Sequence, residues 1–171
     1  MQSDEANALK FLNDGIDHLN IAIKLNSNFA DGYGLLSAMY GEKIGIQPWT
    51  GIKYGSMCNM LIRKAKELEP NNPRLYMIEG TSSMYTPEQW GGSKEIAREL
   101  FIKSSELFKN EKSLSTMPDW GGSEIYAWLG QIEIEMHNIE KAIYYYEQGL
   151  EIDTSNHWIK KILMPRALIK K

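Results

Sequence analysis

The feature that most constrains this 171-residue chain is a helical period in its apolar residues. Between residues 4 and 25, apolar side chains recur at steps of three and four, which places them on one face of a helix. They are Leu9, Leu12, Ile16, Leu19 and Ile23. The same period returns in later segments, and the alternation expected of strands is nearly absent. The sequence therefore predicts an all-α fold.

Turn-forming residues divide this pattern into about eight helices. We expect them at residues 4–25, 30–43, 53–68, 74–85, 94–110, 123–136, 139–152 and 156–171. The residue before a proline avoids the α-helical region, so Pro70 and Pro73 mark a sharp break between two helices. A polar linker covers residues 111–119. Pro165 stands inside the last helix, where we expect a kink or a break because proline removes a hydrogen bond.

One stretch carries small and aromatic residues at a distinctive spacing. Ala142 follows Gly130 by twelve residues, Tyr146 follows by four more, and Gly149 by three more. The stretch opens with Tyr126-Ala127-Trp128-Leu129-Gly130. It resembles the tetratricopeptide repeat (TPR) pattern at nearly every diagnostic position, with Thr154 where the closing proline usually stands.

Two weaker copies precede this repeat. The first includes Gly15, Leu19, Ala22, Ser27, Tyr33, Leu36, Ser37 and Tyr40, and the second includes Ala65, Pro70, Tyr76, Gly80, Ala97, Phe101 and Ser104. The stretches from 40 to 65 and from 80 to 97 exceed a standard unit, and loops can absorb the extra length. The resemblance covers about Gly15 to Thr154. It implies a right-handed, TPR-like solenoid of helical hairpins. We expect one domain over residues 1–171, with about three degenerate repeats and a capping helix at 155–171.

The resemblance also implies a binding surface. In TPR proteins the first helices of successive pairs line a concave groove that binds extended peptides or partner helices. By spacing, the partner-binding residues here are Asp31, Arg74, Met77, Thr81, Glu124, Trp128 and Gln131, with the small residues Gly34, Ala38 and Ala127 among them. Some relatives hold a terminal carboxylate with lysine and asparagine at these positions. Both are missing here, which disfavours a receptor for chaperone tails.

The composition of the chain excludes some classes of partner. The 19 basic and 22 acidic residues give a net charge of −3, which does not supply the cationic field that nucleic acids require. No stretch approaches the ~18 continuous apolar residues of a membrane span, so we expect no membrane insertion. The sequence leaves the compartment open: cytoplasmic by default, or periplasmic if an upstream export signal was removed. Exposed end helices would also allow a homodimer.

Candidate chemistry is sparse, and we predict no catalytic, cofactor-binding or metal-binding residues. His18, His137 and His157 show no metal-ligand or catalytic spacing. Cys58 is the only cysteine and stands where the repeat favours a small buried residue. Glu133 and Glu135 are two apart on a helix and do not share a face. The chain is therefore not expected to be an enzyme.

Two Trp-Gly-Gly-Ser turns are the most distinctive local motif, at residues 90–93 and 120–123. In each, the serine is suited to cap the following helix. The alternative is an anion pocket formed by the glycine amides beside an indole. Trp49, Trp90 and Trp120 all fall in predicted loops and could bind a small molecule or a glycan. That is our alternative to the leading hypothesis, a module that binds a protein or peptide partner.

Overall fold

A computed structural model describes residues 2–111 and 120–170 of the chain. These residues form eight α-helices and no strand, so the predicted all-α fold is confirmed. The helices are α1 (Gln2–Leu25), α2 (Ala30–Ile46), α3 (Gly51–Leu68), α4 (Pro73–Tyr85), α5 (Lys94–Asn110), α6 (Glu124–Glu135), α7 (Ile139–Ile152) and α8 (Met164–Lys170). Residues 112–119 of the predicted linker lie outside the described residues. No described helix is long and apolar enough to cross a lipid bilayer.

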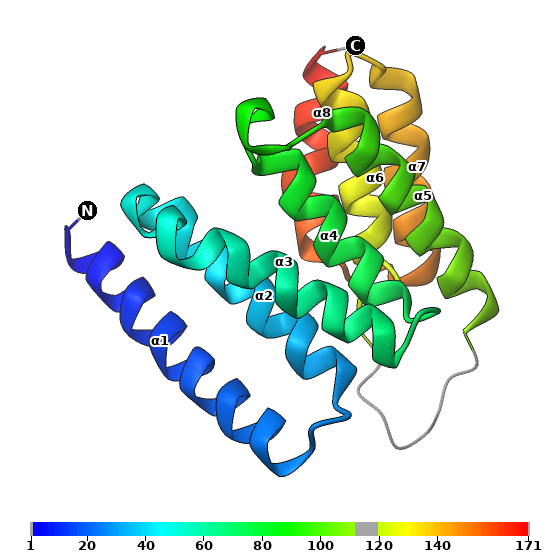
Figure 1. Cartoon of the computed structure of the whole chain (residues 1–171). Helices are drawn as coiled ribbons and strands as arrows, with labels where there is room; N and C mark the ends of the chain where they lie inside the picture. The colour runs from blue at the N-terminus through cyan, green and yellow to red at the C-terminus, as the bar shows by residue number, and fades with distance from the viewer. Residues whose placement is uncertain (1, 112–119, 171) are drawn as a thin grey trace. The chain divides into compact units, whose positions relative to one another are not determined.

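The chain divides into two compact units, Met1–Ile78 and Glu79–Lys171, and the boundary passes through α4. In the first unit, α2 packs against both α1 and α3 (Figure 1). The core of this unit consists of Ile16, Leu36, Tyr40, Cys58 and Leu61. Ile16 belongs to the apolar period that predicts α1, so the face expected from the sequence is the face that packs.

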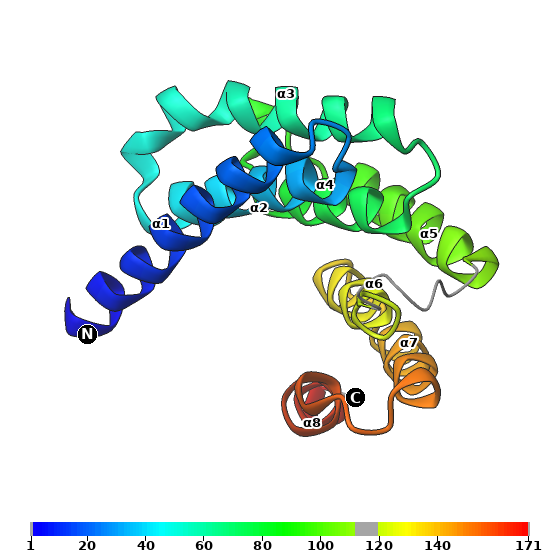
Figure 2. The ribbon, with the colours of Figure 1, turned by 90° about the horizontal axis from the view of Figure 1, so that it is seen from below.

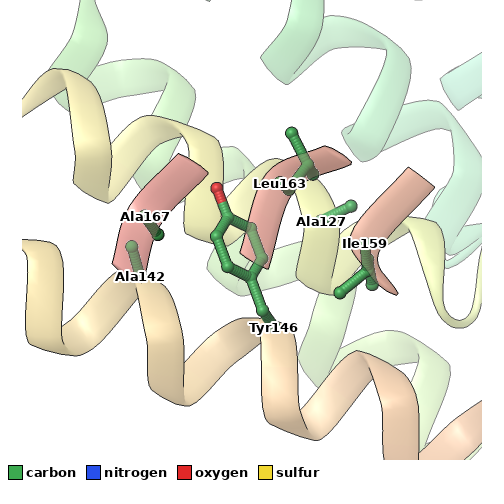
Figure 3. Close-up of a cluster of buried hydrophobic side chains, with 6 residues drawn as sticks. All are labelled: Ala127, Ala142, Tyr146, Ile159, Leu163 and Ala167. Atoms are coloured by element: carbon green, nitrogen blue, oxygen red, sulfur yellow. The ribbon is translucent and has the colours of Figure 1, made fainter. Parts of the chain in front are cut away.

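In the second unit, α6 packs against α5 and α7, and α7 packs against α8. Figure 2 shows α6, α7 and α8 following one another in space as they do along the chain. A cluster of buried side chains joins these three helical segments (Figure 3). It comprises Ala127, Ala142, Tyr146, Ile159, Leu163 and Ala167.

Small residues allow helices of the second unit to approach closely, as the repeat pattern predicts. A Cβ atom added to Gly130 would lie 2.0 Å from Cε1 of Tyr146, and one added to Gly80 would lie 2.5 Å from Cε1 of Phe101. Both aromatic side chains are fully buried. Each aromatic ring therefore occupies the space that a larger residue at the glycine would need.

A buried carboxylate ties α5, α6 and α7 together. Glu133 on α6 has no exposed surface, and its Oε1 lies 2.6 Å from Nε of Arg98 and 3.1 Å from Nζ of Lys141. Asn138 donates a hydrogen bond of 2.8 Å to Oε2. Burial alone would raise the pKa of the Glu133 carboxyl, but these three donors hold the pKa below its ordinary value. The charge is therefore stabilised where it is buried.

The last helix runs through Pro165 without breaking. Before the proline, Ile159–Leu163 form a π-helical turn, in which the Met164 amide donates to the carbonyl of Ile159. This wider turn accommodates a proline that lacks an amide and clashes with the preceding turn of an α-helix. The helix does not break at the proline: its regular hydrogen bonding changes at the π-helical turn, and α8 continues to Lys170.

Candidate functional site

The predicted partner-binding residues fall in both units. In the first unit, Asp31 accepts a 2.6 Å hydrogen bond from Asn72, while Arg74 and Met77 are buried. In the second unit, Thr81 lies half-buried on α4, Glu124 is exposed, and Trp128 and Gln131 lie half-buried on α6.

Trp128 is the centre of a group of four rings in the second unit, which we call the aromatic cluster: Tyr85, Phe101, Trp128 and Trp158. The Trp128 ring centroid lies 4.9 Å from that of Trp158, with the two rings steeply tilted at 68°. Tyr85 meets Trp128 edge-on at 6.2 Å, and Phe101 is nearly parallel to it at 6.2 Å. Edge-to-face and offset-parallel rings at these distances attract one another beyond their apolar burial.

The fold fixes the positions of three rings of the aromatic cluster. Trp128 lies between the buried residues Ala127 and Leu129, so its helix cannot rotate. Phe101 is held against Gly80. Trp158 follows Asn156, whose side chain accepts a 3.0 Å hydrogen bond from the Ile159 amide and so fixes the start of the last helix.

The aromatic cluster runs from the core to the solvent. Phe101 has no exposed surface, Trp128 and Trp158 are half-buried, and Tyr85 is 65% exposed. One turn beyond Trp128, Gln131 accepts a 3.0 Å hydrogen bond from the hydroxyl of Tyr146. Burial raises the pKa of that Tyr146 hydroxyl, which keeps it a neutral donor. The cluster therefore presents uncharged aromatic surface that suits apolar or planar groups of a ligand.

The sequence pattern names Trp128 as a candidate but none of the three rings that contact it, Tyr85, Phe101 and Trp158. Tyr85 was predictable from the sequence, because it follows Thr81 by four residues on the same helix and therefore lies on the same face. The pattern puts Trp158 in a capping helix, and its contact with Trp128 depends on tertiary packing.

The other candidate residues take structural or exposed positions. Cys58 is buried, and its thiol donates to the carbonyl of Ser37 at 3.4 Å. Burial raises the pKa of this thiol, which disfavours the reactive thiolate. His18, His137 and His157 are all exposed. Within residues 2–111 and 120–170, no group of three or more His, Cys, Asp or Glu residues is placed to hold a metal ion.

In the two Trp-Gly-Gly-Ser turns the first glycine has the same backbone conformation, but the serine side chains form different hydrogen bonds. Gly91 and Gly121 both adopt positive φ angles, 92° and 94°, which glycine accepts without strain. Ser93 accepts a 3.2 Å hydrogen bond from the Ile96 amide and caps α5, as predicted. The capping prediction is wrong for Ser123. That side chain is buried and instead donates to the carbonyl of Gly149 at 2.9 Å and accepts from Asn156 at 2.9 Å.

The loop tryptophans are not equivalent either. Trp49 is 70% exposed and Trp90 is 77% exposed, whereas Trp120 is half-buried. Trp49 and Trp90 are therefore accessible to a ligand, and they are far more exposed than Trp128.

Known proteins resemble this chain in structure and not in sequence. No protein-family model matches the sequence, and no curated protein matches it. Among solved structures, TTC0263, a thermophilic TPR protein of Thermus thermophilus, has a TM-score of 0.71 at 16% identity, covering 95% of this chain and 75% of that one. Pseudomonas aeruginosa pilF has a TM-score of 0.63 at 18% identity, covering 99% of this chain and 68% of that one.

A third similar structure is the HusA haemophore of Porphyromonas gingivalis. Its TM-score is 0.66 at 24% identity, covering 78% of this chain and 67% of the haemophore. The chain is thus an all-α protein with a TPR-type fold.

Proposed function

We propose that this chain is a protein-interaction module that binds a peptide or a partner protein at the aromatic cluster. The fold supports this proposal, since TPR-type helical pairs display the side chains of their first helices to partners. Tyr85 and Trp128 come from α4 and α6, which are first helices in the repeat pattern, and Trp158 comes from the segment predicted as the cap.

The single observation that carries the proposal is the contact of Trp128 with three other rings, one of them largely exposed. Tryptophan and tyrosine dominate the binding energy of protein interfaces, because they bury much apolar area and lose little conformational freedom. The preferred partner segment would carry an apolar or aromatic side chain over Trp128. Thr81 and Gln131 would supply polar contacts at its edge.

Selection from a library of displayed peptides tests this proposal. We expect the wild-type chain to enrich peptides with apolar or aromatic residues, and Trp128→Ala to weaken their binding by at least about tenfold. Tyr85→Ala, at an exposed position that leaves the core intact, should weaken binding in the same direction. Trp90→Ala removes a tryptophan outside the cluster and should bind like the wild type. Enrichment of no peptide, or equal binding by Trp128→Ala and wild type, would refute the proposal.

A second candidate is the binding of a planar apolar small molecule on the same rings. Two observations favour it: Trp128 and Trp158 meet at 4.9 Å, and one similar structure is a haemophore. Haem is the natural probe, since it is planar and apolar over most of its surface. Titration with haemin should shift its main absorption band in the wild type and much less in Trp128→Ala. An unchanged spectrum, or an equal shift in both proteins, would exclude this candidate.

A further inference from the structure

Basic residues are segregated at the end of the chain. Residues 154–171 hold five of the 19 basic residues, Lys160, Lys161, Arg166, Lys170 and Lys171, and none of the 22 acidic residues. The whole chain carries a net charge of −3, so this segment opposes the sign of the rest. A local cationic segment in an acidic chain points to a specific anionic partner rather than to overall charge attraction.

The structure places these charges on an outward face. Ile159, Leu163 and Ala167, spaced four residues apart, are buried in the core cluster of the second unit (Figure 3). The opposite side of the same helical segment therefore faces away from that core. Lys161, Arg166, Leu168 and Ile169 are all exposed on this segment. Within α8, Arg166 and Ile169 are three residues apart and thus neighbours on one face.

The exposed cations have no acidic partner within the described part of the chain. Lys160 donates only to the carbonyl of Thr154, at 3.3 Å, and Lys161, Arg166 and Lys170 form no ion pair with a described residue. By contrast, Arg98 and Lys141 of the same unit pair with Glu133. The charge on the last helix is therefore available to a partner.

Apolar side chains accompany these cations. Leu168 is 55% exposed and Ile169 is 86% exposed. Aliphatic side chains beside unpaired lysine and arginine, with no acidic residue between them, are typical of a helix that lies in a membrane interface. The long basic side chains reach the lipid headgroups while the aliphatic ones enter the acyl boundary.

We propose that this cationic face, formed by Lys160, Lys161, Arg166, Leu168, Ile169 and Lys170, docks on the surface of a bilayer rich in anionic lipid. The contact is peripheral and leaves the fold unchanged. Anionic headgroups satisfy the cations, and the acyl boundary offers an apolar environment to Ile169, the most exposed of the apolar side chains on this face. A bilayer satisfies both. The proposal concerns a face other than the aromatic cluster and does not depend on the proposed function.

Co-sedimentation with vesicles tests this proposal on the full chain. We expect binding to phosphatidylcholine vesicles that contain about one third phosphatidylserine, and little binding to pure phosphatidylcholine. Raising the salt from about 0.1 M to about 0.5 M should release the protein, because salt screens the headgroup charge. The paired variant Lys161→Gln/Arg166→Gln should weaken binding by at least about tenfold. Leu168→Ser/Ile169→Ser should also weaken it, and both pairs alter exposed positions only.

The matched control is Lys103→Gln/Lys109→Gln, which removes the same charge from two exposed positions on α5. We expect this variant to bind vesicles like the wild type. Equal binding to both vesicle types, or equal loss in the control and the test variant, would overturn the proposal. So would a wild type that ignores the anionic vesicles and binds polyglutamate instead, since that result would assign the face to an acidic polypeptide.

Discussion

At the scale of single residues, the pairing of a glycine with an aromatic ring is what the sequence predicts best. The spacing from Gly130 to Tyr146 points to a close helix contact, and the Tyr146 ring does lie over Gly130. The spacing does not predict that Glu133 is a buried carboxylate with ionic partners. In the sequence, Glu133 can be compared only with Glu135, and the two lie on different faces of the helix. The partners of Glu133, namely Arg98, Asn138 and Lys141, come from other segments, and only tertiary packing brings them together.

Replacing Gly130 by alanine should destabilise the protein by about 2–3 kcal/mol, because the added Cβ overlaps a ring that is buried and cannot move. Gly41→Ala is the matched control. Gly41 also lies inside a helix, but no atom lies within 4 Å of an added Cβ there. That substitution should stabilise by up to about 1 kcal/mol through helix propensity. Urea unfolding measures both, and equal effects would contradict the close helix contact.

Glu133→Gln should destabilise by about 3 kcal/mol, since it removes the charge that Arg98 and Lys141 both neutralise. The control is Glu135→Gln, which removes an exposed ion pair with Lys94 at 3.0 Å. Exposed pairs contribute at most about 1 kcal/mol. The free energies of unfolding of the two variants show whether the buried ion pairs of Glu133 stabilise the fold more than the exposed ion pair of Glu135 does. A Glu135 effect as large as that of Glu133 would show that burial is irrelevant.

At the scale of elements, all eight predicted helices are present, because hydrophobic period and turn residues are local signals. The ends are less accurate: α2 runs beyond its predicted end at 43, through Gly45 to Ile46. The connection between the helices predicted at 30–43 and 53–68 is shorter than expected, since Pro48–Thr50 form a 3₁₀ turn and α3 begins at Gly51. The π-helical turn before Pro165 was not predictable as such, because a proline signals only that the regular hydrogen bonding changes.

The two serines of the repeated turn motif give a test at this scale. Ser93→Ala should cost about 1 kcal/mol, the value of a helix cap. Ser123→Ala should cost more, about 2 kcal/mol, because it leaves two buried partners, the Gly149 carbonyl and the Asn156 amide, without their hydrogen bond. Thermal unfolding of the two variants would reveal the order. A reversed order would mean that Ser123 serves as an ordinary cap.

At the scale of the whole molecule, the fold type was predictable and the aromatic cluster only partly. The place of Trp128 in the repeat makes it a candidate residue, while Tyr85 and Trp158 join the aromatic cluster through contacts that no local pattern encodes. That the two units act as one domain stays a prediction. The binding role of all seven partner-binding residues stays a prediction too, namely Asp31, Arg74, Met77, Thr81, Glu124, Trp128 and Gln131.

Acid should lower the free energy of unfolding, because it protonates Glu133. Its folded-state pKa lies below its ordinary value of 4.5, so the unfolded chain binds the proton more tightly. The stabilisation is therefore complete above about pH 4.5 and is lost as the pH falls through the folded-state pKa. The free energy of unfolding, followed between about pH 7 and pH 3, should fall more steeply in the wild type than in Glu133→Gln. Parallel curves would contradict the assignment.

The most direct test of the aromatic cluster as a binding surface uses the five tryptophans of the chain as reporters. Each indole N–H gives one resonance in a nitrogen-labelled sample, and substitution of each tryptophan by phenylalanine assigns them. On addition of a peptide selected by the wild-type chain, the resonances of Trp128 and Trp158 should shift, and those of Trp49 and Trp90 should stay in place. Shifts confined to Trp49 and Trp90 would instead place the ligand on the exposed loops and contradict the account.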